Sequence, residues 1–485
     1  MYLGIDLGST NTKAAIYDAS MQLIGQMSCP VDYQRENGFV EFDAECYFEK
    51  LAALIAQLTQ KYGVQSIHQI ALTGQAESLV CIDASGHTLM PAISWMDERS
   101  SEECRELAAQ FDASRCEQVT GQQALLPTWP ATKILWLRKH RPDVFSNTAT
   151  FMLLKDYIVF RLTGKKLADM SIATFTFYFD IYEKCYWQEI LNAIGISESQ
   201  LPPLVEPCTI AGPLTGAAAQ ALGLSSQTLV NVGTLDHFAG MIGTGNVHPG
   251  GVTLSTGTVM ALAVMSQEPA PRSSGIAMHY GFLPDTHVML PVAESGGVSL
   301  EWFRRTCMGT VDYDELNSVL SSRSENALIF LPYLVGTNAP EFDSDAVGMF
   351  WGLRQEHDAF DMARAVMEGV AFMLRKNCDS IAANGTTLDH IIATGGGAKS
   401  PIWCQLQADI TGLPVIVPEV TEAACLGAAI IAATADGCYT DYSEAGQKCV
   451  RTKNVYTPSI SERAEKKYQQ FKLLYCASLE AMRLK

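Results

Sequence analysis

The sequence predicts an α/β protein built from two domains. Strand-like runs alternate with amphipathic helices along much of the chain, which is typical of α/β folds. At 485 residues the chain is too long for one hydrophobic core. Two segments with apolar residues around a Ser/Thr/Gly turn, 3–16 and 251–262, lie about half a chain length apart. We therefore place one domain at residues 1–245 and the second at residues 246–485.

Composition and charge argue against several classes of partner. Hydrophobic residues make up 48% of the chain and charged residues 18%, as in compact soluble proteins. The formal net charge of −18 disfavours nucleic acid and anionic membranes, because both need a basic face. The 14 cysteines include no Cys-x-x-Cys pair, and no signal peptide precedes the first strand, so we expect a reducing, cytoplasmic location. The most apolar segment, 423–435, is too short to span a bilayer and predicts a buried helix.

The opening segment predicts a hairpin that binds a metal-bound polyphosphate. Two apolar runs flank the turn Gly8-Ser9-Thr10-Asn11, with Asp6 before it and Lys13 after it. Small residues let backbone N–H groups approach an anion, and the hydroxyls and the ammonium add further donors. An acid beside such a turn would repel a phosphate unless a metal ion lay between them. Turns of this composition also occur in hairpins that bind nothing, so this segment alone leaves both interpretations open.

A second segment repeats this pattern. Apolar residues flank Thr256-Gly257-Thr258 in the same order as around the first turn. An ordinary hairpin with a Thr-Gly turn is the alternative. The matched placement favours two related halves that face one nucleotide.

Between the two hairpins the sequence predicts a helix and three strands around a helical region. Apolar residues at helical spacing predict a helix over 46–62. Short apolar runs predict strands at 67–72, 79–82 and 229–233. The region 100–222 is predicted to be mostly helical.

After the second hairpin, a Gly-rich turn follows a strand. A strongly amphipathic helix over 361–383 precedes the strand 390–393 and the turn Gly395-Gly396-Gly397, and a helix over 403–411 follows. Three glycines allow the backbone to approach a flat ligand such as adenine, although such turns also occur without a ligand. The chain contains no GxxxxGK[ST] loop, and this turn does not fit the GxGxxG fingerprint.

Asp236 is the candidate general base. It follows the strand 229–233 at the start of a small-residue helix, the place where ligands gather in open α/β sheets. The helix N-terminus favours its ionised form. In a loose phosphoryl-transfer transition state the base accepts the hydroxyl proton late, so an ordinary carboxylate is sufficient. The alternative is an aspartate that only caps the helix.

A cluster near the first-domain strands is a candidate substrate site. Polar groups beside an aromatic face suit a polyhydroxylated molecule, which accepts and donates hydrogen bonds and presents C–H faces. Surface ion pairs or a core aromatic residue would give the same pattern. The residues of this cluster are Gln75, Glu77, Trp95, Asp97 and Arg99.

Two long motifs resemble the FGGY family of carbohydrate kinases, in the actin-like, ribonuclease-H-like ATPase superfamily. One family signature is matched throughout by the segment that begins with Gly348-Met349-Phe350-Trp351-Gly352-Leu353, continues for seven residues and ends with Asp361 to Glu368. The other family signature is nearly matched by the segment Pro130 to His140. The match fails just before this segment, at Thr128, where the signature expects other residue types. The resemblance covers Met1 to about Gly437 and implies two ribonuclease-H-like domains with an interdomain cleft.

The resemblance also implies roles for matched positions, with ATP and Mg²⁺ as cofactors. Asp6 would hold Mg²⁺, usually through water, and Asp236 would be the catalytic base. The sugar would bind mainly to the first domain and ATP mainly to the second. The positions implied to contact the nucleotide are Gly8, Ser9, Thr10, Asn11 and Lys13 in the first hairpin, Thr256, Gly257 and Thr258 in the second, and Gly395, Gly396, Gly397 and Ala398 in the adenosine loop.

The candidate substrate residues depart from the best-known relatives. Xylulose kinases usually carry Met-His where this chain has Ala76-Glu77. Glycerol kinases carry Arg-Glu there, so Glu77 matches and Ala76 does not. Trp95 and Arg99 fit both groups, and the remaining similarity leans towards xylulose-type ketose kinases.

The leading hypothesis is ATP-dependent phosphorylation of a sugar hydroxyl. The expected partner is a small sugar, either a xylulose-like ketose or a related sugar or polyol, and a homodimer is the oligomeric state to test. One alternative is an actin- or chaperone-like ATPase, which would share the hairpins but not the FGGY signature. The other is a non-catalytic, sugar-responsive protein; as a transcriptional regulator it would need a DNA-binding module, which this acidic sequence does not show.

Overall fold

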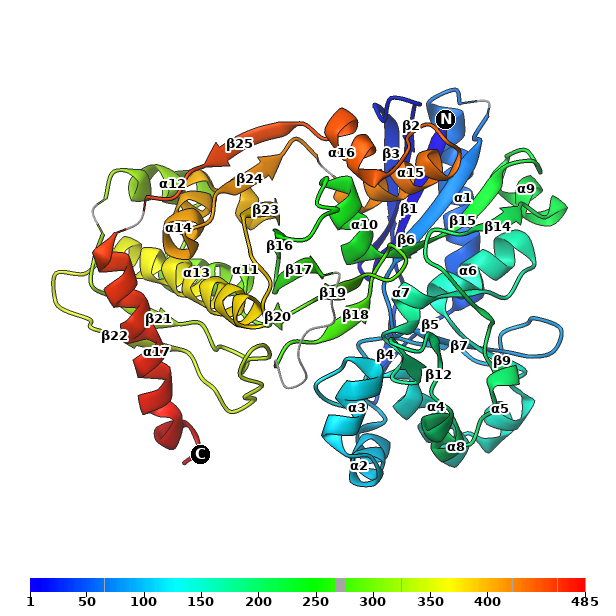
Figure 1. The fold of residues 1–485 in the computed structure, drawn as a ribbon, viewed down its shortest axis with the longest axis horizontal. Helices are drawn as coiled ribbons and strands as arrows, with labels where there is room; N and C mark the ends of the chain where they lie inside the picture. The colour runs from blue at the N-terminus through cyan, green and yellow to red at the C-terminus, as the bar shows by residue number, and fades with distance from the viewer. Residues whose placement is uncertain (65, 267–274, 324, 421, 460, 485) are drawn as a thin grey trace. The chain divides into compact units, whose positions relative to one another are not determined.

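The structure is a computed structural model that describes residues 1–485 except residue 65, the segment 267–274 and residues 324, 421, 460 and 485. It divides into two compact units (Figure 1). Unit 1 comprises Met1–Val247, Met278–Val288 and Val420–Val450, and unit 2 comprises His248–Ala277, Met289–Glu419 and Arg451–Lys485. Each unit combines a sheet with packed helices, so the predicted α/β fold with two domains is confirmed.

Unit 1 is built on a six-stranded sheet in the order β14-β15-β6-β1-β2-β3. β1 runs antiparallel to β2 and parallel to β6, and β6 runs parallel to β15. The opening segment therefore forms the predicted hairpin, and a parallel strand lies directly beside it. The strands are β1 (Tyr2–Leu7), β2 (Asn11–Tyr17), β3 (Leu23–Pro30), β6 (Gln69–Gly74), β14 (Ile210–Pro213) and β15 (Leu229–Leu235).

Apolar helices cover this sheet. α15 (Ala423–Ala435) packs on β1 and β6 and crosses α10 (Asp236–Gly243), while α1 (Ala44–Lys61) and α6 (Leu154–Thr163) contribute to the main core of the unit (Figure 1). The predicted buried helix over 423–435 is thus confirmed as α15. The close contact between α15 and α10 requires glycine at position 427, because a Cβ there would lie 1.8 Å from Ala239 O of α10.

A second core of unit 1 lies beside a five-stranded sheet in the order β4-β5-β8-β7-β9. The region 100–222 is largely helical as predicted, but it also holds strands of only two to four residues, too short to show an alternating pattern. The remaining strands of unit 1 before residue 248 are β4 (Gln34–Glu36), β5 (Phe39–Phe42), β7 (Leu79–Ile82), β8 (Ala92–Ile93), β9 (Thr150–Leu153), β10 (Ala168–Asp169), β11 (Phe179–Asp180), β12 (Cys185–Tyr186) and β13 (Leu204–Val205). The helices are α2 (Ser101–Gln110), α3 (Ala113–Thr120), α4 (Pro130–His140), α5 (Pro142–Asn147), α7 (Met170–Ala173), α8 (Gln188–Ile194), η1 (Glu198–Gln200), α9 (Gly216–Leu222) and, near the end of the chain, α16 (Tyr442–Cys449).

Unit 2 is built on the strands β17-β16-β23-β24-β25, with β20 beside β17. β16 runs antiparallel to β17 and parallel to β23, which repeats the arrangement of β1, β2 and β6. The strands after residue 247 are β16 (Gly251–Thr256), β17 (Met260–Ser266), β18 (Met278–Tyr280), β19 (His287–Met289), β20 (Val292–Ala293), β21 (Ile329–Leu331), β22 (Met349–Trp351), β23 (His390–Gly395), β24 (Val415–Pro418) and β25 (Thr452–Tyr456). The helices of unit 2 are α11 (Gly297–Cys307), α12 (Tyr313–Ser321), α13 (Ala359–Ala383), η2 (Gly397–Lys399), α14 (Pro401–Thr411) and α17 (Glu462–Met482).

The long helix predicted over 361–383 begins two residues earlier, as α13. Asp358 caps it, because its carboxylate accepts the N–H groups of Phe360 and Asp361 while the Asp361 side chain accepts the Asp358 N–H. A reciprocal cap of two aspartates lies outside the apolar pattern on which the prediction rested. Within the described part of the chain, no helix combines the length and the apolarity that a membrane span requires.

Candidate active site

The ends of three parallel strands bring distant segments of unit 1 together. The register places Asp6 of β1 beside Thr73 of β6, and Thr73 beside Thr234 of β15. The carboxyl ends of parallel strands lie at one edge of a sheet, where ligands bind in open α/β folds. The segments that start at this edge are the turn after Leu7, the segment from Gln75 to Glu77, and Asp236.

Asp6 has the environment of a metal ligand. Its Oδ1 is buried and has no hydrogen-bond partner among the described residues. Burial, followed by the charge of Asp236, raises the pKa of Asp6 to about 7, while Lys13 lowers it. An unpartnered carboxylate oxygen close to a second acid fits a divalent cation. No cluster of three His, Cys, Asp or Glu side chains surrounds the position in the described structure, so an ion here would retain water ligands, as Mg²⁺ does.

Lys13 lies directly opposite Asp6 in the antiparallel pairing of β1 and β2. Its Nζ donates a hydrogen bond of 2.6 Å to Glu422 Oε2, at the residue that precedes α15. The side chains of Lys13 and Glu422 are 35% and 29% exposed, so solvent reaches the ion pair. Exposed pairs of this kind contribute little stability, so a phosphate could replace the glutamate at small cost.

Asp236 is the first residue of α10, and the N-cap position belongs to Leu235. Its Oδ1 accepts the N–H of His237 at 2.6 Å. Among the described residues no hydrogen bond engages Oδ2, and the side chain is half-buried. The carboxylate is therefore held at one oxygen and can accept a proton at the other.

A buried polar network holds the strand end that carries Asp236. β15 shifts its register against β6 just before Thr234, at a bulge. Lys155, which is fully buried and ion-paired with Asp169, donates to Val232 O at 2.7 Å. Ser171 Oγ donates to Asp169 and lies 2.7 Å from Thr234 Oγ1. A bulge changes the direction of the side chain that follows it, here Asp236. Lys155, Asp169 and Ser171 are buried beneath the bulge, so they position Asp236 rather than contact a ligand.

Gln75 ties the end of β6 to the first hairpin. Its backbone N–H donates to Leu7 O at 3.1 Å, and its Nε2 donates to Gly8 O at 3.3 Å. Its Oε1 accepts the hydroxyl of Ser78. The amide thus connects the predicted substrate segment to the predicted phosphate turn.

Glu77 has a strained backbone and a half-buried carboxylate. Its φ of 64° lies in the left-handed region, which is uncommon for residues other than glycine and recurs at functional sites. Burial raises the pKa of Glu77 to about 7, while Lys133 and a hydrogen bond with Thr128 lower it. Fully buried Lys133 donates to the carbonyl oxygens of Glu77 and Ser94 at 3.1 and 2.8 Å and so fixes this turn. Burial also lowers the pKa of Lys133 to about 8, against the opposing charge of Glu77.

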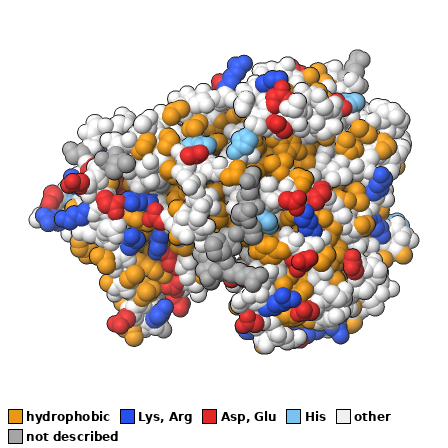
Figure 2. Space-filling model, in the orientation of Figure 1, with side chains coloured by type: hydrophobic (Ala, Val, Ile, Leu, Met, Phe, Trp, Pro, Cys, Tyr) orange, Lys and Arg blue, Asp and Glu red, His pale blue; other side chains and the backbone are white. Residues whose placement is uncertain are grey.

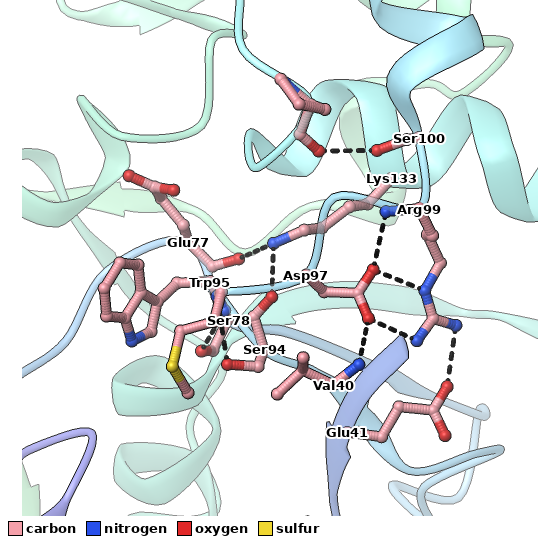
Figure 3. Close-up of polar contacts among 12 residues, drawn as sticks. Val40, Glu41, Glu77, Ser78, Ser94, Trp95, Asp97, Arg99, Ser100 and Lys133 are labelled. Atoms are coloured by element: carbon pink, nitrogen blue, oxygen red, sulfur yellow. Dashed lines mark hydrogen bonds and ion pairs between the residues drawn. The ribbon is translucent and has the colours of Figure 1, made fainter. Parts of the chain in front are cut away.

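Figure 3 shows Glu77 and Trp95 on one side of this polar cluster and Arg99 on the other. Trp95 is 38% exposed, and its backbone N–H donates to Ser78 Oγ at 3.1 Å. The Arg99 side chain is only 1% exposed. Its guanidinium donates to Asp97 through two bonds of 2.7 Å and pairs with Glu41 at 2.7 Å. The structure therefore brings Gln75, Glu77 and Trp95 together and engages Arg99 in the layer behind them.

The second hairpin forms an equivalent turn in unit 2. Thr256 pairs with Met260 across the hairpin and with Gly395 of β23. Gly395 has φ 78°, and a Cβ there would lie 2.9 Å from Thr256 O, so the position requires glycine. The N–H of Gly297 donates to Gly257 O at 2.8 Å and attaches the turn to the start of α11.

A cavity of about 500 Å³ opens beside this turn. Its walls are mainly apolar and include Leu300, Leu316, Met367 and Trp403. This volume is within the range of small-molecule sites. Of the predicted nucleotide residues in unit 2, Gly395 and Ala398 do not line the cavity, whereas Thr256, Gly257, Thr258, Gly396 and Gly397 do.

Sequence reasoning did not identify several residues of these sites. α11 and α12 contribute Glu301, Tyr313 and Asn317 to the cavity. The pair Gly296-Gly297 could have indicated a close backbone approach in the sequence. The structure shows that approach, since a Cβ on Gly297 would lie 2.3 Å from Gly257 O. Asn317 gives no such signal, because one polar residue on an amphipathic helix resembles its exposed neighbours.

Charged side chains of both signs are visible on one face of the molecule (Figure 2). On the face shown in Figure 2, acidic and basic side chains are interspersed in small groups, and no broad basic area is visible among the described residues. The face drawn there offers no continuous attraction for a polyanion.

Comparisons with known proteins match almost the whole chain. Family models described as the N-terminal and C-terminal domains of the FGGY family of carbohydrate kinases match residues 1–243 and 252–435. A xylulose kinase from Staphylococcus epidermidis is 31% identical over 467 residues, which cover 94% of this chain and 92% of the relative. The crystal structure of a ligand-bound xylulose kinase from Lactobacillus acidophilus has 29% identity and a TM-score of 0.92, covering 99% of this chain and 98% of that one. A gluconate kinase from the same organism also has 29% identity, with a TM-score of 0.91 and the same coverage.

Proposed function

The chain belongs to the FGGY family of carbohydrate kinases, and from this membership we propose that it transfers the terminal phosphoryl group of Mg-ATP to a hydroxyl of a small sugar. The single observation that supports the proposed mechanism is that Asp6 and Asp236 lie at the same edge of the unit 1 sheet. One of these acids has an unpartnered buried oxygen, and the other has an unengaged oxygen. A metal site beside a proton acceptor is what phosphoryl transfer to a hydroxyl requires.

Asp6 is the proposed metal position. The orphaned Oδ1 and the raised pKa both fit a cation that neutralises the carboxylate. A bound Mg²⁺ supplies charge that stabilises the phosphate oxygens. Lys13 and the backbone N–H groups of Gly8 to Thr10 are the proposed phosphate donors on the same hairpin.

Asp236 is the proposed general base. The substrate hydroxyl donates its proton to the carboxylate as the oxygen attacks phosphorus, so the hydroxyl must lie within hydrogen-bond distance of that carboxylate. The His237 N–H and the buried network under β15 hold the carboxylate in orientation. Fixed orientation is a large part of catalysis in a reaction where the protein contributes mainly positioning and charge.

The apolar cavity of unit 2 is the proposed adenosine site. The exposed turn Gly257-Thr258 and the glycines Gly396 and Gly397 line the cavity and allow close backbone approach. The apolar walls suit the faces of a purine base.

Gln75, Glu77 and Trp95 form the proposed sugar site. An amide, a carboxylate and an exposed indole are suited to hydroxyls and C–H faces. Arg99 is proposed to support this site through Asp97, because its donors are already engaged. We propose a xylulose-like ketose, or a related sugar or polyol, as the substrate class.

A coupled assay of ADP release over ketopentoses, ketohexoses, aldonates and polyols tests the proposal. We expect a ketopentose or a related polyol to stimulate ADP release most strongly. Strong stimulation by aldonates alone would contradict the substrate class but not the kinase. Silence over the whole panel with intact ATP hydrolysis would instead favour a binding or conformational ATPase.

A further inference from the structure

Two helices of unit 2 hold an asparagine amide in a defined orientation at the cavity. Asn317 lies on α12 and Ser400 caps α14, and the two helices pack together (Figure 1). The hydroxyl of Ser400 accepts the N–H of Trp403 at 3.2 Å and donates to Asn317 Oδ1 at 2.5 Å. The Ser400 hydroxyl gives its one proton to the asparagine amide, so Oδ1 of Asn317 is the acceptor. The Nδ2 group of Asn317 keeps its own protons for another partner.

The Nδ2 group of Asn317 has no acceptor among the described residues, although Asn317 lines the cavity. Three other polar side chains of the cavity wall, those of Trp403, Glu301 and Tyr313, are engaged. Trp403 Nε1 donates to Met367 O at 3.1 Å. The Glu301 carboxylate accepts the hydroxyl of Tyr313 at 2.7 Å and pairs with Arg304 at 3.0 Å. The cavity thus offers a fixed neutral donor beside apolar walls.

We infer that Asn317 donates a hydrogen bond from Nδ2 to a ring nitrogen of the purine base of the nucleotide. The ring nitrogens N1, N3 and N7 of adenine carry lone pairs in the plane of the ring. When the apolar side chains of the cavity contact the faces of a base, the in-plane lone pairs of its ring nitrogens are left to accept from a polar donor such as Asn317 Nδ2. Ser400 positions Asn317 for this contact, and the inference rests on the proposed adenosine site.

Nucleotide analogues test the inference without relying on a variant that folds. Binding of ADP and of 1-, 3- and 7-deaza-ADP is measured by calorimetry for the wild-type chain. Each analogue replaces one ring nitrogen by C–H and so removes one acceptor. We expect one analogue to bind about threefold to tenfold more weakly than ADP, the range for one neutral hydrogen bond.

A double-mutant cycle assigns the lost bond to Asn317. N317D retains an acceptor for Ser400 and removes the Nδ2 donor. Its carboxylate repels the ring nitrogen of ADP more than the C–H of the sensitive analogue, so we expect N317D to bind ADP no more tightly than that analogue. S318A, at an exposed residue of the same helix that does not line the cavity, should retain the wild-type difference.

Two results overturn the inference. Either the wild-type chain binds all three analogues as tightly as ADP, or the loss with one analogue persists in N317D. A wild-type chain that binds no ADP would overturn the adenosine site of the proposed function as well. Normal ADP binding without coupling to Asn317 overturns this inference alone.

Discussion

The β1–β2 hairpin of unit 1 and the β16–β17 hairpin of unit 2 share a backbone arrangement but differ in chemistry. In both, the first strand pairs in parallel with a strand whose last residue is glycine. Gly74 lies opposite Leu7, and Gly395 lies opposite Thr256. A Cβ on Gly74 would lie 2.6 Å from Leu7 Cβ, and one on Gly395 would lie 2.9 Å from Thr256 O. The two turns therefore need glycine at the same place for the same steric reason.

The side chains at equivalent positions differ in charge. Asp6 faces Lys13 across the first hairpin, whereas Ser255 faces Ala261 across the second. The shared strand arrangement provides a turn of the same shape in both units. The difference in side-chain charge between the two turns indicates that each one is suited to a different ligand. In the proposed function the charged hairpin binds the metal ion and phosphate, and the neutral one borders the adenosine site.

The largest expected effect comes from Asp236, the acid that follows β15 beside the first hairpin. Asp236→Asn retains the shape of the side chain and removes the proton acceptor. We expect kcat for sugar-dependent ADP formation to fall about 10²- to 10⁴-fold, the usual contribution of a general base. ADP binding to unit 2 should be unchanged and serves as the control for folding. Wild-type kcat in this variant would remove Asp236 from the mechanism.

Equivalent substitutions in the two hairpins test the charge difference directly. Asp6→Asn should reduce kcat/KM about 10- to 100-fold and raise the Mg²⁺ concentration for half-maximal activity, because it removes the proposed metal contact. Ser255→Ala, at the matched position of the other hairpin, should leave the Mg²⁺ titration unchanged. Equal effects of the two substitutions would contradict the assigned difference between the hairpins.

Lys13 and Glu422 test whether the lysine of the first hairpin exchanges a carboxylate for a phosphate. Lys13→Met should raise KM for ATP about 10- to 100-fold, since a charge-assisted hydrogen bond contributes about 1.5–3 kcal/mol. Glu422→Gln should lower KM for ATP about two- to fivefold, because the competing ion pair is partly exposed and weak. Steady-state kinetics at saturating sugar measure both. A rise in KM for ATP in Glu422→Gln would show that the glutamate supports nucleotide binding.

The smallest expected effect concerns the segment that follows β6. With its pKa raised to about 7, Glu77 is mostly protonated below that pH and ionised above it. Because the ionised form accepts more hydrogen bonds from sugar hydroxyls, KM for the sugar should fall about two- to fivefold from about pH 6 to about pH 8. Glu77→Gln should have a flat profile over this range, with KM for ATP unaffected. A KM for the sugar that rises with pH in the wild-type chain would exclude the ionised carboxylate as the binding form.

Local pattern was sufficient for the elements whose causes are local. The first hairpin, the buried helix α15 and the position of Asp236 at a strand end all follow from residues that are neighbours in the sequence. The start of α13 was misplaced by two residues, because a pair of capping aspartates carries no apolar signal. Strands of two residues, such as β10, were not found for a related reason, since two residues show no alternation.

The sequence by itself determined the α/β class, the two glycine-rich hairpins, the candidate base and the resemblance to FGGY kinases. Only the tertiary structure decided which side chains remain available. It pairs the buried Arg99 with the distant Glu41, and it pairs Lys13 with Glu422, 409 positions away. It also places Asn317 at a cavity that is formed by residues of α11, α12, α13, α14, η2 and the β16–β17 hairpin. Such contacts join residues far apart in the chain, and neither periodicity nor composition records which distant partner a polar side chain will meet.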